Sequence, residues 1–167
     1  MNQSIKPVKQ PARFIKAQPK TQDDIRHDRD CVVRAICLAA NHFSPDPVPY
    51  RDVYETAYQF GWRTGGIRYD GKTHRRFKSG RHRREWMHQF YINCLDRYGI
   101  QAVRETFKAE PGQQRMRTYL LPADTAWLAC QARHVAFVHD QTVYDTWDSS
   151  DKCVYTCLLY TSDAADD

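Results

Sequence analysis

The sequence lacks several features that define common classes of protein. It has no run of about 18 apolar residues that could span a membrane, and no charged start followed by an apolar stretch. No Cys-x-x-Cys pair and no Walker or dinucleotide glycine motif occurs, and the histidines at 74, 82 and 88 match no zinc spacing. We therefore expect a cytoplasmic protein with no metal, no cofactor and no membrane partner.

The C-terminal segment 157–167 (CLLYTSDAADD) looks like the translation of a transposon-end sequencing adapter. We exclude it from the expected fold, as one would an expression scar, and expect the natural chain to continue after Thr156 in sequence not represented here. Without it the six cysteines become five, an odd number that favours reduced thiols. The formal net charge rises from +5 to +8, because three of the 20 acidic residues lie in this segment.

The rest of the chain has the size and composition of one globular domain. A length of 156 residues allows a real core but not two domains, and 41% hydrophobic and 13% aromatic residues argue against disorder. Residues 1–20 contain three prolines, five basic residues and no acid, which predicts a flexible basic arm. We expect a folded domain over 21–156, and a monomer.

Apolar spacing and turn residues predict the order of the elements. Helices are expected over 31–41, 50–60, 85–98 and 113–121, and strands over 100–103, 126–130, 134–138 and 142–145. A tight turn at Asp140 and Gln141 joins the last two strands. With helices first and strands after them, the pattern predicts an α+β fold with an antiparallel sheet.

Cys31 is the most informative residue, because it begins an apolar helix just after two acids in the segment 28–36 (DRDCVVRAI). A helix N-terminus offers unpaired N–H groups and the positive end of the macrodipole, and both favour a thiolate. Such a thiol is a candidate nucleophile. The alternative is a small core residue, which is the usual role of a free cysteine.

A histidine and an acid in the late strands complete a candidate triad. His134 starts one strand, and Asp145 ends the next. With a two-residue turn, Ala136 faces Asp145, so Asp145 lies diagonally from His134 on the same face and Asp148 points to the other face. Asp145 then orients His134, which takes the thiol proton and returns it to the leaving group. His134 as a surface residue, Asp145 as a turn residue and His27 as a competing base remain open.

The order of cysteine, histidine and acid resembles the papain-like cysteine peptidase superfamily. It is nearest to small bacterial and phage proteins related to the peptidase domains of bacteriocin-exporting transporters. The segment 28–36 also resembles the nucleophile motif of ovarian-tumour (OTU) deubiquitinases. The resemblance covers two patches of the chain. It implies a papain-like fold, with the nucleophile helix packed against the sheet, that hydrolyses a peptide or isopeptide bond in a peptide or protein substrate.

The chain departs from that pattern at the oxyanion donor. Papain-like enzymes commonly place a glutamine about six residues before the cysteine, but Ile25 stands there and the nearest glutamine is Gln22. Gln22 and the residues around Asp28 and Asp30 are therefore the candidates for oxyanion or support roles. A catalytically inactive relative is an alternative.

A basic segment, 72–84, supports a rival interpretation, that of a nucleic-acid-binding protein. Its seven positive residues are Lys72, Arg75, Arg76, Lys78, Arg81, Arg83 and Arg84. Together with the basic arm they could neutralise phosphates, with Phe77 or Trp86 stacking on bases. The same segment fits a solvated loop, or a flap that attracts acidic surfaces.

Overall fold

The structure is a computed structural model, and it describes residues 13–21, 29–62 and 79–161. The elements in chain order are β1 (Phe14–Lys16), α1 (Cys31–Phe43), α2 (Tyr50–Gln59), α3 (Gly80–Asp96), β2 (Gln101–Thr106), the short 3₁₀ helix η2 (Thr118–Leu120), β3 (Ala126–Gln131), β4 (His134–His139), β5 (Thr142–Asp145) and β6 (Thr156–Thr161). The fold is of the α+β kind, as the sequence predicted.

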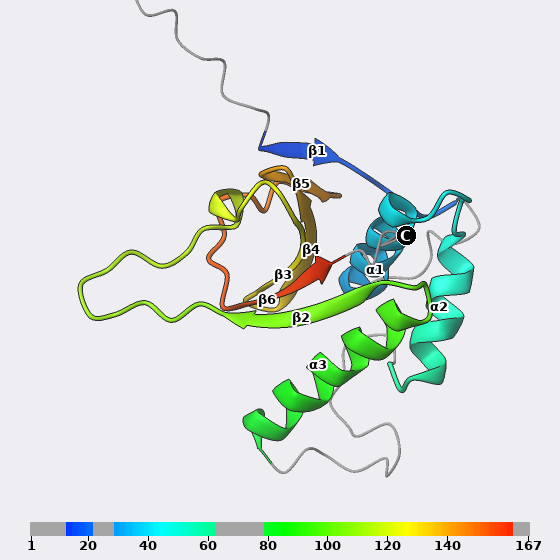
Figure 1. The fold of residues 1–167 in the computed structure, drawn as a ribbon, viewed down its shortest axis with the longest axis horizontal. Helices are drawn as coiled ribbons and strands as arrows, with labels where there is room; N and C mark the ends of the chain where they lie inside the picture. Colours follow the sequence, from blue (N-terminus) through cyan, green and yellow to red (C-terminus); the bar gives the residue numbers. More distant parts are fainter. Residues whose placement is uncertain (1–12, 22–28, 63–78, 162–167) are drawn as a thin grey trace, which may run out of the picture.

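The six strands form one sheet in the order β1-β5-β4-β3-β6-β2. All neighbouring pairs are antiparallel except β1 and β5, which are parallel. The sheet is therefore mixed, with an antiparallel centre and one parallel edge strand. In Figure 1 the long strand β2 runs beside α3, while β1 lies at the opposite edge.

Alternation along the strands divides the interior into two layers. Leu128, Val135 and Phe137 belong to the larger core, which they share with inward residues of all three helices. Ala129, Ala136 and Val138 face the other way, into a smaller core with Leu121 and Val154. The helices thus cover one face of the sheet, and irregular segments cover the other.

Helix α1 packs against β4 and β3, and its sequence explains why. Apolar residues occupy nearly every position between Cys31 and Ala40, so the helix is buried on most of its circumference. The expected helices at 31–41 and 50–60 are confirmed with small shifts at their ends. Helix α3 starts five residues earlier than expected, because the Ser79 hydroxyl accepts the backbone N–H of His82 at 3.3 Å and caps it.

The expected helix over 113–121 is wrong. Only the single turn of η2 forms there, because the backbone N–H groups of Thr118 and Tyr119 donate to the carbonyls of Lys152 and Ser150. These bonds to a distant segment replace the intrahelical ones. The segment therefore becomes part of the layer over the smaller core.

The described sheet includes strand residues beyond both expected limits of the folded domain. Phe14–Lys16 of the expected arm pair with Val143–Asp145 and add an edge strand to the sheet. At the other end, residues 157–161 continue β6, which lies between β3 and β2. The reason is that backbone pairing accepts a strand on either side, and Leu158 is fully buried in the larger core.

Candidate active site

Cys31 is the first residue of α1, and its side chain is half-buried. The N-cap residue, Asp30, makes no side-chain hydrogen bond to the first turn. The first helical bond runs from the Arg34 N–H to the Asp30 carbonyl at 3.0 Å. The N–H groups before Arg34 therefore keep their positive potential beside the sulfur, as expected at a helix start.

His134 is the first residue of β4, and it follows a tight turn in which Arg133 has a φ of 55°. Its Nε2 lies 2.5 Å from Asp145 Oδ2. A hydrogen bond and the charge of the same ring lower the pKa of Cys31, and Asp145 leaves Nδ1 as the ring nitrogen open to the sulfur. The structure thus brings together the three residues that the sequence singled out.

The register of the last hairpin puts Asp145 in this place. His139 lies opposite Thr142, as expected for a two-residue turn. Asp140 and Gln141 have φ values of 51° and 56°, the conformation of a type I′ turn that matches the twist of the strands. Asp148 is exposed and accepts hydrogen bonds from Ser150 instead, so the choice of acid made from the sequence agrees with the geometry.

Asp145 is 6% exposed, and both of its carboxylate oxygens accept hydrogen bonds. Oδ2 accepts from the Ser149 hydroxyl at 3.2 Å as well as from His134, and Oδ1 accepts from the Thr146 backbone N–H at 2.7 Å. The carboxylate therefore has one fixed orientation. A fixed acid holds the imidazole in one tautomer and plane.

Charge and burial act in opposite directions on the thiol. Burial is the largest influence on Cys31 and raises its pKa, but the hydrogen bond and charge of His134, the Val135 N–H and the charge of Arg34 outweigh it. The net result is a pKa of Cys31 below its ordinary value of 9.0. The ion-pair form of the site is favoured in this way.

The pKa of the His134 imidazole is shifted upwards, opposite to that of the thiol. Burial, the largest influence, lowers the pKa of His134, whereas the hydrogen bonds that the ring donates to Asp145 and Cys31, and the negative charges of those groups, raise it to about 9. His134 is therefore protonated near neutral pH. A thiolate beside an imidazolium is a far better nucleophile than an isolated thiol at that pH.

Asp30, the N-cap residue of α1, holds the start of the helix through polar contacts. It is 2% exposed, and its carboxylate lies 3.0 Å from Lys20 Nζ, 3.3 Å from Arg34 Nε and 2.5 Å from the Tyr50 hydroxyl, which donates to it. Asp30 thus ties the start of α1 to α2 and to the segment after β1. The support role expected for Asp30 fits this geometry.

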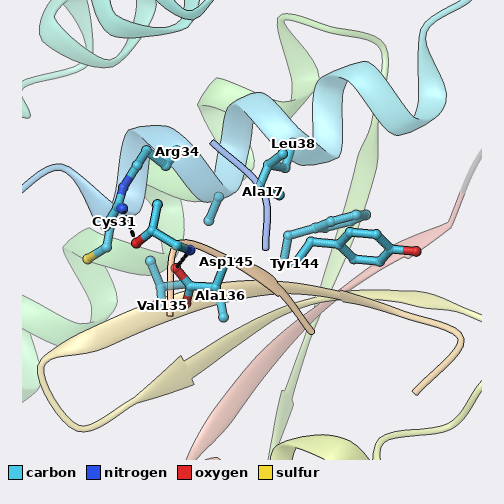
Figure 2. A pocket seen from close by; sticks show the side chains of 11 residues that line it. Ala17, Cys31, Arg34, Leu38, Val135, Ala136, Tyr144 and Asp145 are labelled. Carbon is cyan, nitrogen blue, oxygen red and sulfur yellow. Dashed lines mark hydrogen bonds between the residues drawn. The ribbon is translucent and has the colours of Figure 1, made fainter. Parts of the chain in front are cut away.

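A small pocket beside the thiol lies between α1 and strands β4 and β5 (Figure 2). Cys31 and Arg34 lie at one end of it, and Leu38 and Tyr144 at the other. On another side of the Cys31, His134 and Asp145 cluster, the Trp147 ring lies 4.8 Å from the His134 ring, centroid to centroid, and it is 43% exposed. Trp147 therefore forms an open aromatic wall next to the imidazole.

Part of the predicted set lies outside the described residues. These are Gln22 and Asp28 of the candidate oxyanion or support residues, His27, and Lys72, Arg75, Arg76, Phe77 and Lys78 of the basic segment. The remaining basic residues, Arg81, Arg83 and Arg84, are exposed on the first turns of α3. Trp86, expected as a stacking residue, is half-buried and stacks on Phe90 at 5.4 Å between ring centroids.

Sequence reasoning missed three residues that hold the site together. Arg34 binds both Asp30 and the Thr146 hydroxyl, and Ser149 binds Asp145. Arg34 carried a signal, because a charged residue in an otherwise apolar buried helix needs a partner. Thr146 and Ser149 are small hydroxyl residues just after an acid, a pattern that is too common to single them out.

Comparisons with known proteins return no relatives: no protein-family model, no curated protein and no solved structure matches this chain. Within 13–21, 29–62 and 79–161, no helix is long and apolar enough to cross a membrane. The same residues contain no cluster of three or more side chains suited to holding a metal ion.

Proposed function

We propose that the protein is a papain-like cysteine hydrolase that cleaves a peptide or isopeptide bond with Cys31, His134 and Asp145. The observation that carries the proposal is the 2.5 Å hydrogen bond between His134 Nε2 and Asp145 Oδ2, beside a thiol whose pKa is lowered by a hydrogen bond and the charge of the same ring. The opposite pKa directions of the thiol and the imidazole support it, because both favour the reactive ion pair. The position of the nucleophile helix against the sheet supports a papain-like arrangement.

In the proposed reaction, the Cys31 thiolate attacks the acyl carbon of the bound substrate and forms a tetrahedral intermediate. The first N–H groups of α1 lie beside the sulfur and would stabilise the oxyanion in place of a glutamine side chain. His134, already protonated, gives its proton to the leaving amine, and an acyl-enzyme remains. His134 then removes a proton from water, the water attacks the thioester, and the acid product leaves with the thiol restored.

Asp145 orients and stabilises the imidazolium through these steps without becoming protonated itself. Because Asp145 is held by Ser149 and Thr146, the ring has a single orientation in which Nδ1 meets the thiol. Rotation of the ring would break the bond to Asp145. Catalysis is therefore expected to fall by several orders of magnitude when the tautomer is lost.

The proposal is tested with an electrophilic vinyl-sulfone probe and a panel of peptide and ubiquitin-like substrates. We expect the probe to modify Cys31, and both Cys31→Ala and His134→Ala to abolish hydrolysis. Cys153→Ala is the matched control, because Cys153 is also a half-buried free thiol but lies outside the catalytic line. Hydrolysis that survives in Cys31→Ala and His134→Ala would refute the proposal. Duplex binding that weakens steeply with salt, with no hydrolysis by the unchanged chain, would favour the nucleic-acid-binding alternative.

A further inference from the structure

A groove lies over the smaller core, between the segment that contains η2 and the connection from β5 to β6. The two segments run antiparallel, and backbone hydrogen bonds such as that from the Thr118 N–H to the Lys152 carbonyl, at 2.9 Å, join them (Figure 1). Leu121 and Val154 anchor them in the smaller core. The groove has a volume of about 620 Å³, which is in the range of sites that bind small ligands.

Arginine side chains line this groove or border it, and two of them are held against aromatic rings. Arg115 and Arg117 line the groove, and Arg115 Nη1 donates to the Tyr155 hydroxyl at 3.4 Å. The Arg13 guanidinium lies over the ring of Tyr119, another lining residue, at 3.9 Å from the ring centroid. A guanidinium held by a ring loses less freedom on binding, and its N–H fork matches the two oxygens of a carboxylate.

Positive charge exceeds negative charge around the groove. Segments 114–120 and 147–155, together with Arg13, contain four positive residues and two acids. Both acids are already engaged, since Asp148 accepts hydrogen bonds from Ser150 and Asp151 lies 3.6 Å from Arg13 Nη1. Lys152, the fourth positive residue, is exposed. The groove is therefore suited to an anionic ligand.

The groove also continues from the proposed active site. The exposed Trp147 ring lies beside the His134 ring, and Lys152 Nζ lies 5.9 Å from the centroid of the Trp147 ring. Lys152 directly follows Asp151, which lines the groove. A chain bound beside His134 can therefore pass over Trp147 and Lys152 and enter the groove.

The acid of the site and the groove are on the same face of the sheet. Asp145 alternates with Val143, which belongs to the smaller core. The Ser149 hydroxyl donates to Asp145, and the carbonyl of the next residue, Ser150, accepts the N–H of Tyr119 in the groove wall. The groove thus begins directly after the residue that holds the acid.

We propose that this groove binds an acidic segment of a peptide substrate, with its carboxylates on Arg115, Arg117 and Lys152. The inference deepens the proposed function, and it rests on that function in taking the bound chain as the substrate that Cys31 cleaves. A peptide is favoured over a nucleic acid because the groove leads to a centre suited to acyl chemistry. In addition, Arg13 covers one face of the Tyr119 ring, which leaves less aromatic surface for stacking bases.

The binding test uses the full chain with Cys31→Ala, so that the ligand is not consumed. Fluorescence anisotropy compares a fluorescein-labelled peptide rich in glutamate with a copy in which glutamine replaces every glutamate. We expect the glutamate peptide to bind about tenfold more tightly at low salt, and Arg115→Gln combined with Lys152→Gln to remove most of this difference. Both residues are exposed, and a melting curve checks that the double variant folds.

Arg97→Gln is the matched control, because it removes the charge of an exposed arginine at the end of α3, on the face covered by the helices. It should leave the affinity for the glutamate peptide unchanged. Equal affinity for the two peptides would overturn the inference. An equal loss of affinity in Arg97→Gln and in the double variant would also overturn it.

Two further measurements link the groove to the thiol. In the unchanged chain, the glutamate peptide should slow the labelling of Cys31 by the vinyl-sulfone probe, because the bound chain passes the sulfur. For a cleaved glutamate-rich peptide, the double variant should raise KM about tenfold and leave kcat nearly unchanged, as expected when binding is lost equally from the ground and transition states. Undiminished labelling at saturating peptide would overturn the continuity of groove and site.

The inference and the proposed function fail separately. Hydrolysis of the panel with no preference for glutamate-rich peptides would overturn the inference and leave the hydrolase standing. Binding of the glutamate peptide that is lost in the double variant, in a chain that hydrolyses none of the panel, would support the acidic-peptide groove and count against the hydrolase. A single-stranded oligonucleotide that binds more tightly than the glutamate peptide, and is released by the double variant, would overturn the choice of a peptide.

Discussion

Arg34 Nη1 donates a 2.6 Å hydrogen bond to Thr146 Oγ1, and so joins α1 to the segment that follows Asp145. The Thr146 backbone N–H in turn donates to Asp145 Oδ1, and Arg34 Nε lies 3.3 Å from Asp30 Oδ1. One guanidinium therefore spans two segments that are far apart in the sequence. This side chain therefore adds a polar link between the two segments to the core packing that already holds α1 against β4.

We expect Arg34→Ala to destabilise the protein by about 2 kcal/mol, because it removes one partner of a buried carboxylate. It should also raise the pKa of Cys31, since the charge of Arg34 is one of the influences that lower it. Urea denaturation and the pH dependence of iodoacetamide alkylation measure the two effects. Arg97→Ala, an exposed arginine at the end of α3, is the control and should change neither.

Removal of the His134 imidazole is expected to raise the pKa of the Cys31 thiol again. In His134→Ala the hydrogen bond and charge that lower the pKa of Cys31 are lost, while burial, the largest influence, still raises it. The apparent pKa for alkylation of Cys31 should therefore move from below 9.0 towards higher values. A stopped-flow alkylation profile between pH 5 and 10 records the change. An unchanged profile would show that His134 does not act on the thiol.

The bond between His134 and Asp145 predicts a pH-dependent stability. In a Cys31→Ala background the thiolate no longer contributes, but the hydrogen bond and charge of Asp145 remain, and we expect them to keep the pKa of His134 above its unfolded value of 6.5. The folded state then holds the proton more tightly, so the added stability is complete below pH 6.5 and is lost as pH rises through the folded-state pKa. Melting temperatures across this range should fall in Cys31→Ala and stay flatter in the double variant with Asp145→Asn.

His88 on α3 is expected to have the opposite effect on the pH dependence of stability. It is buried, its Nδ1 has no hydrogen-bond partner among the described residues, and burial and then the charges of Arg104 and Arg84 lower its pKa to about 4. Between these pH values the unfolded chain binds a proton on His88 that the folded chain does not bind. Stability therefore falls as pH drops from 6.5 towards 4. His88→Leu should flatten this acid limb of a melting-temperature profile. His82→Ala, an exposed histidine on the same helix, should not.

The two-residue turn that sets the register of Asp145 can be made more stable by substitution. Asp140 and Gln141 both adopt positive φ, which asparagine and glycine tolerate best. Replacing the pair with Asn-Gly should stabilise the protein by about 1 kcal/mol without moving the register. Urea denaturation measures the gain, and probe labelling of Cys31 tests whether the site is preserved. A loss of stability would mean that the original side chains contribute contacts beyond the turn.

Local signals explain what could be predicted from the sequence. Cys31 begins a helix with a continuous apolar pattern, which made this helix predictable. The strands at His134 and Asp145 alternate across a two-residue turn, so the side-by-side position of these two side chains was predictable as well. The edge strand at Phe14 and the strand at Thr156 were missed. Their pairing with β5, β3 and β2 depends on partners distant in the chain, which no local pattern reveals.

The supporting network around the site was also beyond local reasoning. Asp30 was singled out for a support role, but its partners Lys20 and Tyr50 come from segments with no sequence link to it. The same holds for Arg34 and Thr146. Charged residues reveal that a partner must exist, whereas the identity of that partner is a property of the tertiary fold.

The late position of the β4–β5 hairpin in the chain has a consequence during synthesis. When the ribosome has made the first 130 residues, α1 is already synthesised but His134 and Asp145 are not. The Cys31 thiol at that stage has no imidazole beside it. In the hydrolase that we propose, the growing polypeptide would therefore carry no assembled triad, and cleavage would begin only after translation has passed Ser149.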